Sequence, residues 1–272
     1  MPKQMTLAAY FNPTGHHVAS WRHPRALPDA NVNVRHYIEM AKAAEAAKFD
    51  MIFLADGNAT REAHIEAISR SVQFVAHFEP LTLLSALAMH TTRIGLTGTA
   101  STTYQEPYNL ARKFASLDWL SGGRAGWNLV TSAQDAEAKN FGRSRVDDHK
   151  TRYGRAREFA QVVQGLWDSW DDDAFVRDRA TGQFFDPDKL HTLDHKGRFF
   201  QVAGPLNIQR SPQGQPVVFQ AGSSEDGIAL AGKYADAVFT HSPSLDETRA
   251  FRQRVRDAAR AHGRSPDAVK IF

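Results

Sequence analysis

Short apolar runs alternate along the chain with longer amphipathic segments, which is the pattern that parallel strands and their connecting helices produce. After the first apolar run, apolar positions of Val34–Lys48 recur at helical spacing and predict a helix that Asn31 or Asn33 caps. Leu110–Leu120 and Arg155–Trp167 repeat this helical pattern. The apolar runs predict buried strands at Thr6–Phe11, Asp50–Ala55, Arg93–Thr99, Arg124–Thr131, Pro216–Ala221, Asp236–Thr240 and Val269–Phe272.

The order of these elements favours an α/β fold of the (β/α)8 TIM-barrel type. A doubly wound open sheet is the alternative, but such a sheet usually has a Gly-rich turn after its first strand, and this chain lacks one there. The length of 272 residues suits one barrel, so we expect a single domain over residues 1–272.

The segment 168–215 interrupts the alternation, because it is rich in Asp, Gly, Pro and aromatic residues. A structureless loop of that length is uncommon in a compact domain. We therefore expect this insertion to form small hairpins over the barrel mouth or a functional lid, and the alternative is a surface excursion without a role.

Composition narrows the class of protein. The 33 basic and 30 acidic residues are interspersed, so no basic stripe predicts a nucleic-acid surface. The chain contains no cysteine, which excludes disulfides and thiolate metal sites. Neither a secretory leader nor an apolar membrane-spanning run is present, and the chain is interpreted as a cytoplasmic protein without a membrane partner.

Polar residues follow most of the predicted strands, in the stretches "FNPTGHH", "ADGN", "TGTAST", "NLVTS" and "QAGSSEDG". Active sites of barrels lie at the carboxyl ends of the strands, so these ends predict a pocket. Asn128 lies within a predicted buried strand, where an amide is costly unless it is hydrogen-bonded. The alternative for each polar end is an ordinary cap of the next helix.

The residue types at these ends argue against several reaction classes. A metal hydrolase on a barrel typically uses His-x-His, whereas His16 and His17 are adjacent and face opposite sides of a strand. A scattered site of His16 or His17 with Asp56 and His149 is the remaining metal alternative. No Gly-x-Ser-x-Gly elbow and no cysteine nucleophile occur. Hydroxyls and amides dominate the predicted pocket, which suits a cofactor that brings its own reactivity.

Two features point to a phosphate. Gly222, Ser223 and Ser224 form a strand-to-helix turn, where free backbone N–H groups and the helix dipole favour an anion. His149 and Tyr153 stand four residues apart and therefore share one helix face. The alternatives are a capping arrangement of Ser224 near Asp226, and a solvated helix start capped by Asp147 or Asp148.

Six stretches occur in a characteristic order: "GHHVASWRHP", "FDMIFLAD", "STTYQEPYNLARKFASLDWLSGGRAGWNLVTS", "KNFG", "DDHKTRYGRA" and "PVVFQAGSSEDG". Together they resemble the flavin-dependent monooxygenases of the bacterial luciferase-like superfamily. Within it they are most similar to the branch of nitrilotriacetate, EDTA, dibenzothiophene-sulfone and long-chain alkane monooxygenases. The resemblance runs from about Met5 to Phe272.

The resemblance implies a two-component monooxygenase that receives FMNH2, its FMN cofactor in reduced form, from a separate NAD(P)H:flavin reductase. O2 would add to the flavin C4a, and the resulting C4a-peroxide would oxygenate a small organic substrate. The protein would shield this peroxide from water. A homodimer or homotetramer is also expected. By motif, the flavin ring and ribityl chain would contact Asp56, Thr99, Ser101 and Asn128, and the phosphate would contact His149, Tyr153, Ser223 and Ser224.

On the substrate side, the loop after the first strand offers Phe11, Asn12 and His16, and Asn58 and Thr60 are expected to face the same space. His16 is the acid–base candidate, with a structural hydrogen-bonding histidine as the alternative. His16 and Asn128 are therefore the catalytic candidates, and no metal ligand is proposed.

Relatives continue past the equivalent of "DAVKIF" through an eighth strand, so the expected barrel lacks that strand in this chain. An incomplete parallel barrel leaves unpaired edges. Two other functions therefore stay open: a truncated flavin-binding barrel without turnover, and a metal-dependent barrel hydrolase.

Overall fold

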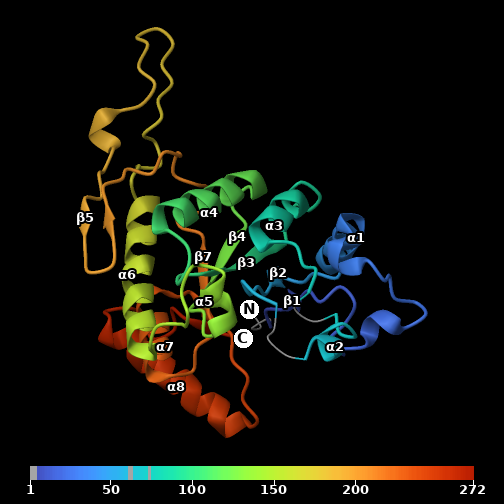
Figure 1. Ribbon diagram of the computed structural model, residues 1–272. Coiled ribbons are helices and arrows are strands. Elements are labelled where there is room, and N and C mark those ends of the chain that lie inside the picture. The colour runs from blue at the N-terminus through green and yellow to red at the C-terminus, as the bar shows by residue number, and fades with distance from the viewer. Residues whose placement is uncertain (1–4, 61–63, 73–74) are drawn as a thin grey trace. The chain divides into compact units, whose positions relative to one another are not determined.

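The structure is a computed structural model that describes residues 5–60, 64–72 and 75–272. The chain forms two compact units, and Figure 1 labels their elements. The first unit comprises Met1–Thr99 and Ser132–Asp147, and the second comprises Ala100–Thr131 and Asp148–Phe272. The strand β3 (Gly95–Ser101) runs across the boundary between them.

The first unit is built on parallel strands. β1 (Ala8–Tyr10) pairs with β2 (Met51–Leu54), and β2 pairs with β3, so that Tyr10 lies beside Phe53 and Phe53 beside Thr97. Its helical segments are η1 (Ser20–Arg22), η2 (Ala30–Val32), α1 (Val34–Ala46), α2 (Ile65–Ile68), α3 (Pro80–Ala88) and α5 (Asp135–Lys139).

Helix α1 begins where the sequence predicted a cap. The side chain of Asn33 accepts a hydrogen bond from the His36 N–H at 3.2 Å, which satisfies a donor that a helix start leaves free. Asn31, the other candidate, is buried, and its amide donates to the carbonyls of Val72 and Val75 instead. Asn33 is therefore the cap, and Asn31 joins two segments of the unit.

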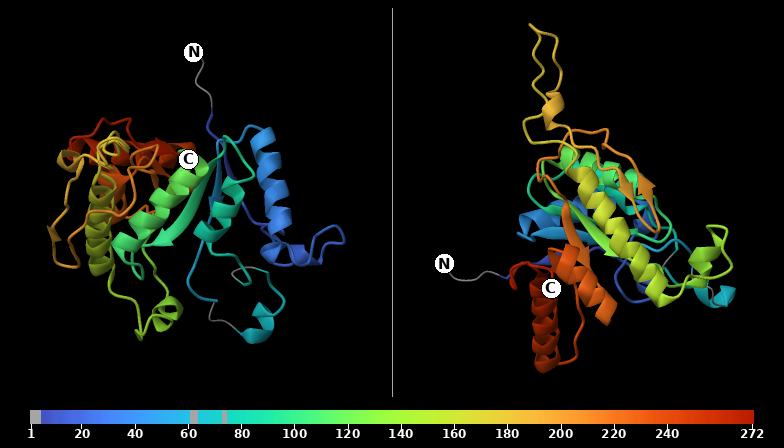
Figure 2. Two further views of the ribbon diagram at one scale, coloured as in Figure 1. Left: turned by 90° about the horizontal axis from the view of Figure 1, so that it is seen from above. Right: turned by 90° about the vertical axis from the view of Figure 1, so that its left-hand side faces the viewer.

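The second unit also has parallel strands with helices between them. β4 (Ala125–Val130) pairs with β7 (Val217–Gln220), β7 with β8 (Ala237–Val238), and β8 with β9 (Lys270–Ile271). Helices α7 and α8 pack against each other (Figure 2). The helical segments of this unit are α4 (Pro107–Ser121), α6 (His149–Trp167), η3 (Pro187–Lys189), α7 (Glu225–Tyr234) and α8 (Leu245–Ala261).

Trp127 on β4 is the centre of the second unit's core. Its indole N–H donates to the carbonyl of Ala100 at 3.0 Å. Its rings lie 5.9 to 6.3 Å from those of Phe114, Phe159 and Trp167, which belong to helices α4 and α6. Since successive side chains of a strand point to opposite faces, Asn128 faces away from these helices.

Asp118 on α4 holds the start of β4 in place. Its carboxylate is fully buried and accepts hydrogen bonds from the backbone N–H groups of Ala125 and Gln213 and from the Gln213 amide. A buried carboxylate is tolerated where such donors surround it. The register of β4, and with it the position of Asn128, is fixed at this end.

The insertion 168–215 contains an antiparallel pair of short strands, β5 (His195–Lys196) and β6 (Gln201–Val202), which matches the expected small hairpin. Glu158 on α6 anchors it, because its carboxylate accepts from the backbone N–H groups of Phe199 and Phe200 and contacts the His195 ring. A position over a barrel mouth stays a prediction.

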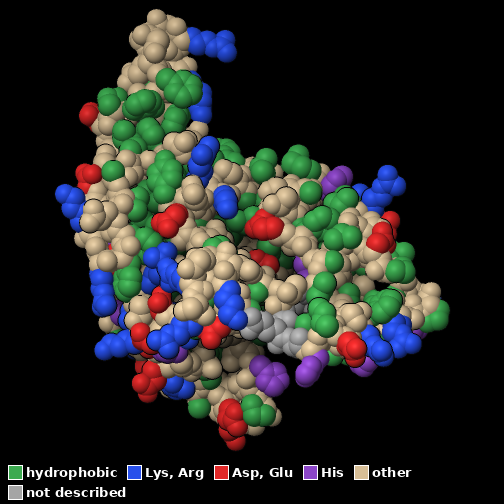
Figure 3. All heavy atoms as spheres, viewed as in Figure 1, with side chains coloured by type: hydrophobic (Ala, Val, Ile, Leu, Met, Phe, Trp, Pro, Cys, Tyr) green, Lys and Arg blue, Asp and Glu red, His purple; other side chains and the backbone are tan. Residues whose placement is uncertain are grey.

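A second part of the insertion, residues 171–186, extends away from the rest of its unit (Figures 1 and 2), and we call it the arm. The ring of Trp170 contacts those of Phe175 and Phe185 at its base. Apolar side chains gather on the arm in Figure 3, and Val176 and Phe184 are exposed there. The arm therefore has a small aromatic core of its own.

The alternation of parallel strands and helices that the sequence predicted is confirmed. All the predicted strands are present, and every strand except β3 is shorter than predicted at both ends. Strand β3 differs, since it extends to Ser101. Thr99 and Ser101 consequently lie inside this strand and not after it. Among the described helices, none is long and apolar enough to span a membrane.

Candidate functional site

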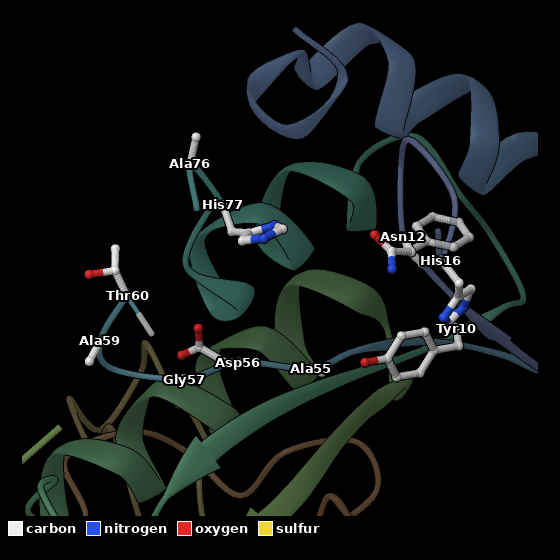
Figure 4. Close-up of a pocket in the computed structure, with 11 residues that line it drawn as sticks. Tyr10, Asn12, His16, Ala55, Asp56, Gly57, Ala59, Thr60, Ala76 and His77 are labelled. Carbon is white, nitrogen blue, oxygen red and sulfur yellow. The ribbon is translucent and has the colours of Figure 1, made fainter. Parts of the chain in front are cut away.

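A cavity of about 490 Å³ lies in the first unit, beside the carboxyl ends of β1 and β2 (Figure 4). Carboxyl ends of neighbouring parallel strands meet at one edge, and the Phe11 N–H extends the pairing by donating to the Phe53 carbonyl. The cavity is lined by Tyr10, Phe11, Asn12, His16, Ala55, Asp56, Gly57, Ala59, Thr60, Ala76 and His77.

The cavity brings together most of the residues expected on the substrate side, namely Phe11, Asn12, His16 and Thr60. His16 lies against the Tyr10 ring, with 5.4 Å between ring centroids, and Tyr10 in turn stacks on Phe53. Aromatic contacts of this kind hold the imidazole at the cavity wall. Tyr10 was not among the sequence candidates, because it lies inside the first strand and not after it.

Asp56 lies at the carboxyl end of β2 and points into the cavity (Figure 4). Burial raises the pKa of Asp56 to about 6, and the negative charges of Glu79 and Glu137 also raise it, while the Gly57 N–H lowers it. Although neighbouring atoms surround much of the carboxyl group, part of the Asp56 residue is still exposed to the solvent of the cavity. A carboxyl with such a pKa can hold a proton in weakly acidic solution.

His77 faces the same cavity from the segment before α3 (Figure 4), and the sequence candidates did not include it. Burial lowers its pKa, so the imidazole is neutral near pH 7. The preceding residue, Ala76, has a φ of 58°, an unfavourable conformation for a residue with a Cβ atom. Glu79 and Pro80 mark a helix start in the sequence, and this signal could have located His77. The loop before that helix lies at the carboxyl ends of the strands.

Asn58 is not among the residues that line the cavity. Its backbone N–H donates to the buried carboxylate of Glu137 at 3.1 Å, and its carbonyl accepts from the Asn140 amide at 2.8 Å. Ser132 also donates to Glu137. These contacts join the loop after β2 to helix α5, which is a structural role.

The remaining residues expected around the flavin ring lie on strands. Thr99 and Ser101 on β3 and Asn128 on β4 are each about 95% buried. Asn128 pairs in register with Phe219 of β7 and lies on the face opposite Trp127. On β4, this is the face opposite to the one that packs on α4 and α6, and a buried polar side chain there needs hydrogen-bonding partners.

In the second unit, the starts of α6 and α7 form a cluster of polar residues. Asp148 caps α6 by accepting from the Thr151 N–H, as one of the two sequence alternatives predicted. The ring of His149 lies 4.5 Å from that of Tyr153, so the two share a helix face. Tyr153 is buried, whereas half of the His149 side chain is exposed.

Ser223 and Ser224 differ in their surroundings. The Ser224 side chain accepts from the Gly227 N–H at 3.2 Å and caps α7, which is the capping alternative of the sequence. Ser223 is exposed at the turn before this helix. Because the Ser224 side chain is used as a cap, the groups that can bind an anion here are the backbone N–H groups at the start of α7 and the exposed Ser223 hydroxyl.

Gly222 opens a cradle between β7 and α7. A Cβ atom at this position would overlap the Gln220 amide nitrogen and lie 2.8 Å from the Tyr153 hydroxyl, so a larger residue would displace these two side chains. Gln220 is 4% exposed, and among the described residues its side-chain oxygen has no hydrogen-bond partner. The Gln220 amide nitrogen, the Tyr153 hydroxyl and the backbone N–H groups can donate to a phosphate, so these residues fit that group, whereas the Gln220 oxygen would need a donor such as a neighbouring hydroxyl.

The polar residues thus form two groups, one in each unit. Three further residues of the second group were not sequence candidates. Gln220 lies beside Gly222, and Arg157 pairs with Asp226, and these contacts between distant residues place them in the cluster. No cluster of three or more His, Asp or Glu side chains suited to a metal ion occurs within residues 5–60, 64–72 and 75–272. His16 lies in the first unit and His149 in the second.

Comparison with known proteins gives consistent matches. The model of the luciferase-like monooxygenase family matches residues 14–272. The chain is 52% identical over 271 residues to N-acetyl-S-(2-succino)cysteine monooxygenase of Bacillus subtilis (strain 168) and 46% identical over 276 residues to nitrilotriacetate monooxygenase component A of Aminobacter aminovorans. These alignments cover 99% of this chain but 60% and 61% of the relatives, so the chain spans about three fifths of their length.

Two solved structures are similar over nearly the whole chain. A crystal structure of long-chain alkane monooxygenase (LadA) has a TM-score of 0.93 at 36% identity and covers 100% of this chain and 64% of that chain. A riboflavin lyase (RcaE), solved with modified FMN and riboflavin, has a TM-score of 0.91 at 34% identity. It covers 99% of this chain and 62% of the other.

Replacing Asp56 by Asn should stabilise the protein at pH 7.5 and not at pH 4. Folding raises the Asp56 pKa from 3.8 to about 6. The free energy of unfolding therefore falls as the pH rises from about 4 to about 6, and it stays lower above pH 6, where Asp56 is ionised in the folded protein. Because Asp56 is solvent-exposed, the expected gain is below about 1 kcal/mol. Thermal unfolding across this pH range measures it.

Glu66→Gln is the control for this measurement, because Glu66 lies on α2 and does not line the cavity. An Asp56→Asn stabilisation that persists undiminished at pH 4 would contradict the proposed protonation.

Proposed function

Because the chain belongs to the luciferase-like monooxygenase family, we propose that it binds reduced FMN and uses O2 to oxygenate a small organic substrate. The observation that carries the proposal is the 52% identity, across 99% of this chain, to a protein named as a monooxygenase. The modified FMN in the riboflavin lyase structure supports the choice of flavin. We also infer that the parallel strands belong to a (β/α)8 barrel, whose closure by an eighth strand stays a prediction.

Bound reduced FMN would supply two electrons, so that one atom of O2 enters the substrate and the other leaves as water. Asp56, Thr99, Ser101 and Asn128 would bind the ring and ribityl chain. Tyr153, His149, Ser223 and the backbone at Ser224 would bind the phosphate. The contribution of the protein would be to orient the substrate and to exclude water.

The cavity of the first unit is the proposed substrate site. Phe11 and Tyr10 give it an apolar wall, and Asn12, His16 and Thr60 give it hydrogen-bonding groups. Such a mixed lining suits a small molecule with both an apolar body and polar groups. The relatives named for N-acetyl-S-(2-succino)cysteine and for nitrilotriacetate make carboxylated compounds the first substrates to test.

A separate flavin reductase is the proposed partner. The relative named component A implies a further component in that system. A homodimer or homotetramer and a cytoplasmic location stay predictions.

A coupled assay tests the proposed function. The protein is mixed with reduced FMN without oxygen and then with isotopically labelled O2, in the presence of N-acetyl-S-(2-succino)cysteine, nitrilotriacetate or dibenzothiophene sulfone. We expect delayed return of the oxidised-flavin absorbance relative to free flavin, and label in one of the products. Flavin binding with hydrogen peroxide as the sole product would favour the barrel without turnover, and absence of flavin binding would refute both.

Exchanging His16 for Ala should lower product formation about tenfold or more while FMN affinity changes less than about twofold, because general acid–base groups typically contribute 10²–10⁴-fold. Product yield and flavin fluorescence titration measure the two effects separately. His17→Ala is the matched control, since His17 is adjacent but does not line the cavity. Equal turnover of His16→Ala and the wild type would remove His16 from the mechanism.

Asn128→Leu should weaken FMN binding roughly fivefold to tenfold, the equivalent of about one hydrogen bond. Leucine has a similar size and suits a buried strand, so the flavin-free protein should still fold, and its melting temperature reports what the amide contributes to the core. Titration and thermal unfolding together make the test. A fall in melting temperature with unchanged affinity would show that the Asn128 amide serves the core and not the cofactor.

A further inference from the structure

Asp226, in the first turn of α7, pairs with Arg157 and His149 beside the Gly222 cradle. Its Oδ1 atom lies 3.0 Å from a guanidinium nitrogen of Arg157, and its Oδ2 atom lies 3.2 Å from Nδ1 of His149. The side chains best able to attract an anion to this cluster are therefore already held by a carboxylate.

The same residues surround the place where a phosphate fits. His149 stacks on Tyr153, the Tyr153 hydroxyl lies 2.8 Å from the Cβ position of Gly222, and the nearly fully buried Gln220 amide faces that position as well. The N-terminus of α7 contributes partial positive charge. Asp226 contributes negative charge within the first turn of that helix, at the residues that pair with it. The Asp226 carboxylate therefore offsets positive charge in a cluster that is rich in hydrogen-bond donors.

The Asp226 carboxylate has a direct consequence for the binding of a dianion. A phosphate would gain hydrogen bonds from Tyr153, Gln220 and backbone N–H groups, but the Asp226 carboxylate would repel it and compete for Arg157 and His149. Arg157 is a residue that an anion site would normally leave available for a bidentate contact. Here it donates to Asp226 instead.

We propose that Asp226 weakens the binding of the flavin phosphate and so keeps the flavin exchangeable. This inference rests on the proposed function. A monooxygenase supplied by a separate reductase takes up reduced flavin and releases oxidised flavin in each cycle, and a strongly cationic phosphate site would retain the spent cofactor. The internal carboxylate limits that affinity without removing the hydrogen bonds that select for the phosphate.

Asp226→Asn tests the proposal, because it removes the charge and keeps the size of the side chain. We expect the Kd for FMN to fall about tenfold and FMN dissociation to slow by a similar factor. Riboflavin, which lacks the phosphate, should change less than about twofold. Fluorescence titration gives the affinities and stopped-flow displacement gives the dissociation rates.

Glu225→Gln is the matched control, since it makes the same change of net charge in the same helical turn. Among the described residues it has no ion pair with Arg157 or His149, so its FMN affinity should change less than about twofold. Asp226→Ser is the second charge-removing variant, to be used if Asp226→Asn does not fold.

The outcomes separate this proposal from the proposed function. Failure of the wild type to bind either flavin would refute the proposed function and this inference with it. Wild-type binding of FMN with unchanged or weaker binding by Asp226→Asn would refute this inference alone, and would show that Asp226 serves to orient Arg157 and His149. Equal tightening for riboflavin would also refute it.

Discussion

The packing of Trp127 determines how the second unit presents its polar residues. The indole contacts rings from α4 and α6 and donates to Ala100, so β4 cannot rotate or shift by one residue without expelling its largest side chain. Strand alternation then directs Asn128 to the opposite face. A single buried aromatic therefore determines which face of the strand is apolar and which can bind a ligand.

The sequence was sufficient to predict elements whose signals are local. Apolar periodicity located the strands, and the caps at Asn33 and Asp148 follow from side chains within three residues of the donors they satisfy. Contacts between distant residues were not predictable in this way. His77 reaches the cavity because of the loop before α3, and Arg157 meets Asp226 only after α6 and α7 have packed. Local periodicity does not contain that information.

The two polar groups differ in their electrostatic character. In the first unit, burial raises the pKa of Asp56 to about 6, and the carboxylates of Glu79 and Glu137 add to this effect. In the second unit, opposite charges pair with one another around the Gly222 cradle. Both arrangements can reduce the local net charge, the first by protonation of Asp56 in weakly acidic solution and the second by ion pairing. Hydrogen bonding and shape then decide what can bind.

The attachment of the hairpin β5–β6 has a consequence for how the insertion can change. Glu158 holds it largely through the backbone N–H groups of Phe199 and Phe200, which every residue except proline provides. These two hydrogen bonds do not depend on the side chains at 199 and 200, whereas the His195 ring also contacts the carboxylate and Phe200 packs on Phe159. Substitutions at hairpin positions without such contacts can therefore leave the attachment to α6 unchanged.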